Sequence, residues 1–145
     1  MSNRSAVPAA PTVDVNVPRF NQGVVGLVTG VGFLTQSPPL VVLMAIVLAL
    51  SAFGPASVAP LTRLYVGVIR PRIQPAGPSE FEPAAPPRFA QRIGAGFLAA
   101  ASLAFAVGVP GLGWGLTLMV TALASLAAAT RICVGCVVYE RMVTP

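Results

Sequence analysis

Four long blocks of apolar residues constrain this chain more than any other feature. They are Gly23–Leu34, Leu40–Phe53, Ile93–Val109 and Leu112–Ala129. Each block, with its flanks, approaches or reaches the roughly 20 residues that an α-helix needs to cross about 30 Å of hydrocarbon. Charged residues make up only 9% of the chain, against roughly 25% in an average soluble domain. We therefore predict an all-α protein with four transmembrane helices in a lipid bilayer.

The distribution of charge predicts the orientation of these helices. The nine arginines and four acidic residues lie before the first block, between the second and third, or after the fourth. An even number of crossings puts these three segments on one side, which the positive-inside rule makes cytoplasmic. We predict a multi-pass protein of the bacterial inner (plasma) membrane with both termini in the cytoplasm. No basic cluster is interleaved with aromatic residues, so nucleic acid is not an expected partner.

Two short sequences occur twice and indicate an internal duplication. P-R-F-N-Q (Pro18–Gln22) returns as P-R-F-A-Q (Pro87–Gln91), and T-R-L-Y-V-G (Thr62–Gly67) returns as T-R-I-C-V-G (Thr130–Gly135). In each half of the chain, P-R-F-x-Q precedes two apolar blocks and T-R-x-x-V-G follows them. Each half therefore crosses the membrane twice, and the two halves have the same orientation. The predicted fold is a four-helix transmembrane bundle of two parallel helical-hairpin repeats.

The duplication sets the expected domain boundaries. A disordered cytoplasmic tail is predicted over 1–17, the first hairpin repeat over 18–70, a proline-rich cytoplasmic linker over 71–86, and the second repeat, which carries C-V-G-C, over 87–145. Small residues recur at helical spacing within the blocks, for example Gly26 with Gly30 and Gly96 with Ala100. Such pairs are expected to let helix backbones approach closely in lipid.

Cys133 and Cys136 are the only cysteines, and they follow the fourth block at the expected cytoplasmic interface. A compartment kept reduced disfavours a permanent structural disulfide there. The first repeat has Tyr65 in the place of Cys133 and Val68 in the place of Cys136, so the thiols are not needed to build the repeat. This difference favours a catalytic task for the pair, the alternative being two small side chains at the interface.

The reactivity of the pair depends on the local helix. If the last helix runs unbroken through Gly135, both cysteines lie near its C-terminal end, where the macrodipole opposes a thiolate. Glu140 adds to this opposition, whereas Arg131 acts against it. A break at Gly135 would improve access and disulfide geometry.

Metal and cofactor chemistry is strongly limited by composition. The chain has no histidine, and the two thiols of one chain cannot supply the four nitrogen or sulfur ligands of a structural zinc site, although a dimer could supply four cysteines. It also lacks lysine, which excludes a Schiff base and a Walker phosphate loop. We expect neither a metal nor a cofactor. No ionisable residue lies within a predicted span, which disfavours a coupled ion transporter.

C-V-G-C after a fourth block, together with the P-R-F-x-Q opening, resembles a small family of bacterial membrane proteins defined only as a domain of unknown function. The resemblance covers most of the chain from Pro18 onward. Its members occur chiefly in actinobacteria and are often encoded near thioredoxin-like and sulfurtransferase proteins. The resemblance implies that Cys133 and Cys136 take part in thiol–disulfide or persulfide transfer with a cytoplasmic thioredoxin-like or rhodanese-like partner.

A second class of function stays open at this point. The duplicated hairpins would also suit a non-enzymatic membrane scaffold or a small-solute pathway, in which the thiols have no task. The sequence does not decide whether the chain is an enzyme or whether it forms a homo-oligomer.

Overall fold

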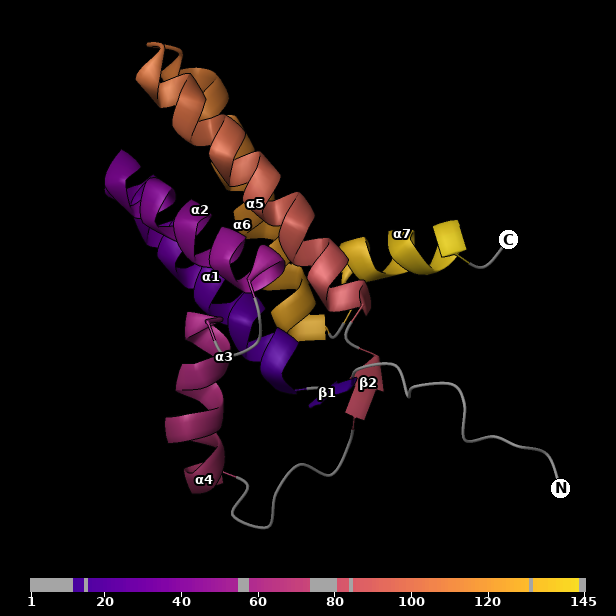
Figure 1. Ribbon diagram of the computed structural model, residues 1–145. Helices are drawn as coiled ribbons and strands as arrows, with labels where there is room; N and C mark the ends of the chain where they lie inside the picture. Colours follow the sequence, from indigo (N-terminus) through magenta and orange to yellow (C-terminus); the bar gives the residue numbers. More distant parts are fainter. Residues whose placement is uncertain are drawn as a thin grey trace, which may run out of the picture.

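The computed structural model describes residues 12–14, 16–54, 58–73, 81–83, 85–130 and 132–143. Its elements in chain order are β1 (Thr12–Asp14), α1 (Asn16–Leu34), α2 (Pro38–Phe53), α3 (Pro60–Leu64), the π-helical segment η2 (Tyr65–Ile69), α4 (Arg70–Ile73), β2 (Phe81–Pro83), α5 (Ala85–Ala106), α6 (Pro110–Thr130) and α7 (Val134–Val143). Apart from one short pair of strands the described chain is helical, which confirms the predicted fold class at this level (Figure 1).

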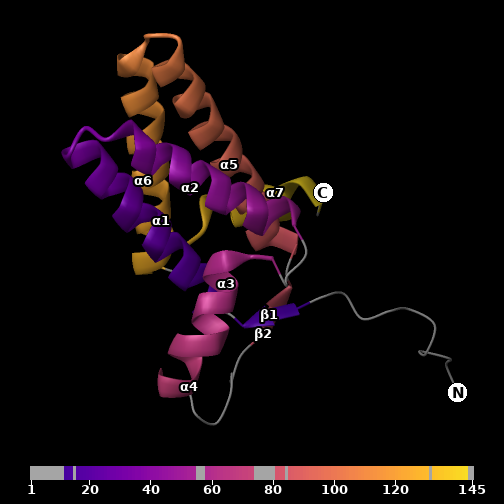
Figure 2. The same cartoon turned by 60° about the vertical axis from the view of Figure 1, so that its left-hand side comes forward.

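The four long helices α1, α2, α5 and α6 form a bundle of two hairpins. Helix α1 packs against α6 and α2 packs against α5, so the first helix of each hairpin contacts the second helix of the other (Figure 2). Prolines suit the starts of α2 and α6, because the first turn of a helix leaves its N–H groups unpaired. The apolar block Ile93–Val109 extends beyond the C-terminal end of α5 at Ala106, because Gly108 adopts a φ of +83° and turns the chain.

The interior of the bundle is largely apolar, and its buried threonine and serine hydroxyls bond to nearby oxygen atoms. The core is built by Val25, Val41, Met44, Leu48, Leu61, Ala95, Leu98, Ala101, Val120 and Ala124. The buried Thr29 hydroxyl lies 2.6 Å from the carbonyl of Val25 and 2.7 Å from the hydroxyl of Thr121. Hydroxyls bonded in this way can stay inside an apolar bundle without a large desolvation penalty.

The outside of the bundle is also apolar. Large exposed side chains include Leu27, Leu34, Leu43, Ile46, Phe53, Leu103, Leu112 and Leu118. Helices α5 and α6, with 22 and 21 residues, are long and apolar enough to cross a membrane, whereas α2 is apolar but has only 16 residues. An apolar exterior around all four helices favours a membrane location.

Only some of the predicted small-residue contacts are present. A Cβ atom added at Gly26 would lie 2.7 Å from the hydroxyl of Ser125 on α6, so α1 and α6 do approach closely there. A Cβ at Gly96 would have no neighbour within 4 Å, and Ala100 is exposed. The prediction of close packing is wrong for Gly96, because spacing alone does not say which face of a helix meets a neighbour.

Arginines bind helix C-termini at one end of the bundle. Arg19 on α1 donates to the carbonyl of Ala128 near the end of α6, at 3.1 Å. Arg92 on α5 donates to the carbonyl of Ala52 near the end of α2, at 3.4 Å, and covers the ring of Phe53. Cations stabilise the last carbonyl groups of a helix. The two repeats therefore make the same type of contact with each other, although the second uses an arginine outside P-R-F-A-Q.

Each hairpin is followed by short helices that pack back onto its own first helix. Helices α3 and η2 contact α1, and α7 contacts α5 (Figure 1). The first set, α3 to α4, continues past residue 70, where the sequence places the end of the repeat. The predicted tail over 1–17 and linker over 71–86 also contribute ordered structure, because β1 pairs antiparallel with β2, with Thr12 opposite Pro83.

Candidate functional site

Cys133 and Cys136 lie where the last long helix has already ended. Helix α6 stops at Thr130, whose hydroxyl donates to the carbonyl of Leu126 at 2.6 Å and accepts from the N–H of Ile132 at 3.3 Å. A new helix, α7, then begins at Val134. The first of the two alternatives drawn from the sequence, a last helix that runs unbroken through Gly135, is therefore wrong. The break precedes Cys133, whereas the alternative had located it at Gly135.

Cys133 caps the N-terminus of α7. Its carbonyl accepts the first helical bond, from the N–H of Val137 at 3.0 Å, and its Sγ accepts from the N–H of Cys136 at 3.4 Å. This is the position of an N-cap residue, with the thiol in the role usually taken by a hydroxyl or carboxylate. The macrodipole at this end favours negative charge, so the geometry supports a thiolate on Cys133 instead of opposing it.

Of the two charged residues that the sequence places near the thiols, only Glu140 is described by the structure. The first turn of α7 contains no acidic residue, and Glu140 lies further along the helix. Arg131 lies outside the described residues. Among the groups that the structure describes, the N-terminus of α7 and the Cys136 N–H both act on the Cys133 thiol.

Two contacts hold α7 against the first turns of α5. A Cβ atom added at Gly135 would lie 2.7 Å from the Cβ of Ala90 and 2.9 Å from its Cα, so only glycine allows this approach. Further along, the rings of Phe89 and Tyr139 lie 5.4 Å apart between centroids. The central glycine of C-V-G-C thus has a packing role, and Ala90 of P-R-F-A-Q provides its counterpart.

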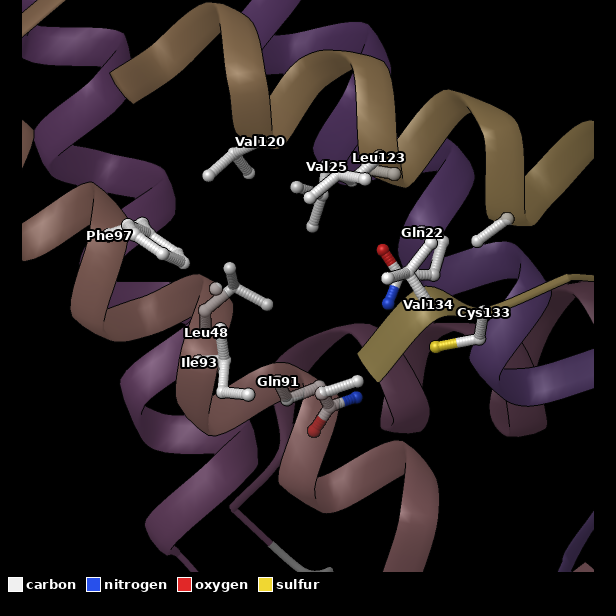
Figure 3. Close-up of a pocket in the computed structure, with 14 residues that line it drawn as sticks. Gln22, Val25, Leu48, Gln91, Ile93, Phe97, Val120, Leu123, Cys133 and Val134 are labelled. Atoms are coloured by element: carbon white, nitrogen blue, oxygen red, sulfur yellow. The ribbon is translucent and has the colours of Figure 1, made fainter. Parts of the chain in front are cut away.

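A cavity of about 60 Å³ opens beside Cys133, between the two repeats. Its walls are mostly apolar and include Leu48, Phe97 and Val120. Gln22 and Gln91, the last residues of the two P-R-F-x-Q sequences, also line it (Figure 3). The sequence marks these glutamines only as polar groups in a first helical turn. Their repetition in both copies was the available signal, but only the fold brings both to one thiol.

The described residues contain no group of three or more histidine, cysteine, aspartate or glutamate side chains that could hold a metal ion. Cys133 and Cys136 are both half-buried. The chemistry that the site offers is therefore that of two neighbouring thiols, one of which caps a helix.

No curated protein and no solved structure matches the chain. A family model described as Domain of unknown function (DUF4395) matches residues 13–144, which includes both repeats and both cysteines. This match confirms the resemblance to a domain-of-unknown-function family, and the chain belongs to the DUF4395 family.

Proposed function

We propose that α1, α2, α5 and α6 all cross the bacterial inner membrane as two parallel hairpin repeats. Helices α1 and α2 pack alongside α5 and α6, and all four expose large apolar side chains. In this arrangement the ends bound by Arg19 and Arg92 face the cytoplasm, as the positive-inside rule requires. Helix α7 then lies at the cytoplasmic surface, and both termini are cytoplasmic.

The proposed activity is thiol–disulfide or persulfide transfer between Cys133 and Cys136 and a cytoplasmic thioredoxin-like or rhodanese-like protein. One observation carries this proposal: the Cys133 thiol caps α7 and accepts a hydrogen bond from the Cys136 N–H at 3.4 Å. Thiolates are stabilised at helix N-termini and in C-x-x-C sequences. Cys133 is accordingly the attacking residue and Cys136 the resolving residue.

In the disulfide reaction, the Cys133 thiolate attacks one sulfur of the partner's disulfide. A bond forms between Cys133 Sγ and that sulfur, the partner's S–S bond breaks, and its second sulfur leaves as a thiolate. Cys136 then loses its proton and attacks Cys133 Sγ, which releases the partner as a dithiol. The pair is oxidised to a disulfide as the partner's disulfide is reduced, and no further oxidant is needed.

The test is to trap the mixed disulfide. Thioredoxin whose resolving cysteine is replaced by serine is activated as a mixed disulfide with thionitrobenzoate and added to membranes that contain the Cys136→Ser variant, so that neither protein can resolve the adduct. We expect a covalent adduct that dithiothreitol removes, in inverted vesicles but not in intact cells, because thioredoxin does not cross the membrane. The matched Cys133→Ser variant should give no adduct.

Other results would count against specific parts of the proposal. An adduct formed when thioredoxin is added to intact cells would show that the cysteines face outward, opposite to the proposed topology. If neither variant forms an adduct, the proposed thiol activity is wrong, and the scaffold or solute-pathway alternative is favoured.

A further inference from the structure

The cavity beside Cys133 has one polar end and one apolar end. The thiol of Cys133 and the amides of Gln22 and Gln91 gather at the first, whereas Phe97 and Val120 form the second (Figure 3). Cys136 is not among the residues that line this cavity. A group attached to Cys133 Sγ can therefore enter the cavity and lie away from the second thiol.

Gln91 is the residue that points most clearly to a ligand. It is only 8% exposed, and within the described part of the chain its amide has no protein hydrogen-bond partner but is not among the fully buried unpaired atoms, so it stays accessible from the cavity that it lines. Buried polar side chains almost always have a partner, because an unpaired buried donor or acceptor is destabilising. An amide that lines a cavity beside a thiol can instead be paired by what enters the cavity.

The size and polarity of the cavity limit that ligand. A volume of about 60 Å³ exceeds what one water molecule needs but is too small for a ring such as a quinone head group. Its largely apolar walls suit a weakly hydrated, polarisable atom, and the amide N–H groups suit a partial negative charge. The outer sulfur of a persulfide has both properties, and Cys133 offers the point of attachment.

We propose that this cavity houses the outer sulfur atom of a Cys133 persulfide, with the Gln91 amide donating a hydrogen bond to it. The inference rests on the proposed thiol activity and assigns its substrate class, which is sulfane sulfur carried by a persulfide. It also gives a role to the repeated glutamines, which neither the bundle core nor the cap of α7 requires.

The loading step is balanced without a redox partner. The Cys133 thiolate attacks the outer sulfur of a donor persulfide, R–S–S–H. The Cys133 Sγ–S bond forms, the donor S–S bond breaks, and its electron pair leaves with the R–S⁻ thiolate. The proton stays on the transferred sulfur, which gives Cys133–S–S–H. Cys136 does not line the cavity, so an outer sulfur held there does not face the second thiol.

The test measures how long the added sulfur survives. The full chain carrying Cys136→Ser, in detergent, is loaded with cysteine persulfide, and the bound sulfur is followed by intact mass and by its removal with cyanide as thiocyanate. In this background we compare Gln91→Met, which keeps the side-chain length but removes the amide, with Gln36→Asn. Gln36 is exposed in the turn at the opposite end of the bundle and serves as the control.

We expect one sulfur on Cys133, removed roughly tenfold faster in Gln91→Met than in the Gln36→Asn control, because the hydrogen bond from the Gln91 amide to the outer sulfur is lost. The melting temperature of Gln91→Met should be equal or higher, because an unpartnered buried amide is removed; a purely structural glutamine would lower it. If Gln91→Met does not fold, Gln22→Met, on the facing helix, is used in the same assay.

Four outcomes would overturn the inference. Equal removal rates in Gln91→Met and the control would exclude Gln91, and sulfur found on Cys136 of the wild-type chain would exclude the cavity. A chain that forms the thioredoxin adduct but takes up no sulfur would exclude the persulfide and keep the disulfide reaction. A chain that does neither would end the inference and the proposed function together.

Discussion

The two repeats solve the same packing problem with different residues. In each, a phenylalanine of P-R-F-x-Q packs against a tyrosine from the short helix that follows the hairpin: Phe20 with Tyr65 at 5.3 Å, and Phe89 with Tyr139 at 5.4 Å between ring centroids. The two tyrosines do not occupy equivalent positions, however. Tyr65 stands where the second repeat has Cys133, and Tyr139 comes later along α7.

Moving the tyrosine along the helix changes what the rest of the segment can do. In the first repeat Tyr65 is only 4% exposed and fills the space beside α1. In the second, Tyr139 takes over the anchoring contact, and position 133 is available for a thiol that caps α7. The two hairpins build the same type of bundle, and the short helices after them differ: one buries a tyrosine and the other carries the thiol pair.

The largest expected effect comes from the anchoring tyrosines. Tyr65→Ala should lower the free energy of unfolding by about 3–5 kcal/mol, since it removes a fully buried aromatic ring. Tyr139→Ala should lower the free energy of unfolding by only about 1 kcal/mol, because Tyr139 is half-buried and mainly its ring contact with Phe89 is lost. Thermal unfolding in detergent measures both. A loss for Tyr139→Ala as large as that for Tyr65→Ala would show that the two short helices are equally structural.

The glycines at equivalent positions give a smaller and more local test. Gly135→Ala should destabilise the packing of α7 on α5 by about 1–3 kcal/mol, because its Cβ would overlap Ala90. Gly67→Ala should change stability by less than about 0.5 kcal/mol, because nothing lies within 4 Å of that position. The measurement is the rate of proteolytic cleavage within α7, which should rise in Gly135→Ala and stay unchanged in Gly67→Ala. Equal cleavage rates in the two variants would contradict the close contact between Gly135 and Ala90.

Much of the bundle could be predicted from the sequence, because apolar blocks long enough for helices are a strong signal. The repeat was visible in P-R-F-x-Q and T-R-x-x-V-G, and the proline at the start of α2 marks one turn between long helices. The contacts at the arginine end could not be predicted in full, since Arg92, rather than its repeat counterpart Arg88, donates to the carbonyl of Ala52.

The chemistry of the thiol pair was the part that the sequence obscured. Thr130 to Cys133 contains neither proline nor glycine, so nothing local marks the end of α6. The break depends on the Thr130 hydroxyl, on the Gly135–Ala90 contact and on the Phe89–Tyr139 pair, which are distributed between α6, α7 and α5. Because α6 ends before Cys133 instead of running on through Gly135, the electrostatic effect expected for an unbroken helix reverses in sign at Cys133.

The most direct test of the central claim is the pH dependence of cysteine alkylation in the full chain. Iodoacetamide reacts with the thiolate, so its rate reports the charged form of each cysteine in the single variants Cys136→Ser and Cys133→Ser. We predict that Cys133 reaches its maximal rate at a lower pH than an ordinary cysteine, whose pKa is about 8.5, and reacts faster than Cys136 at neutral pH. A Cys133 midpoint at or above that of an ordinary cysteine, or a faster Cys136, would contradict the account.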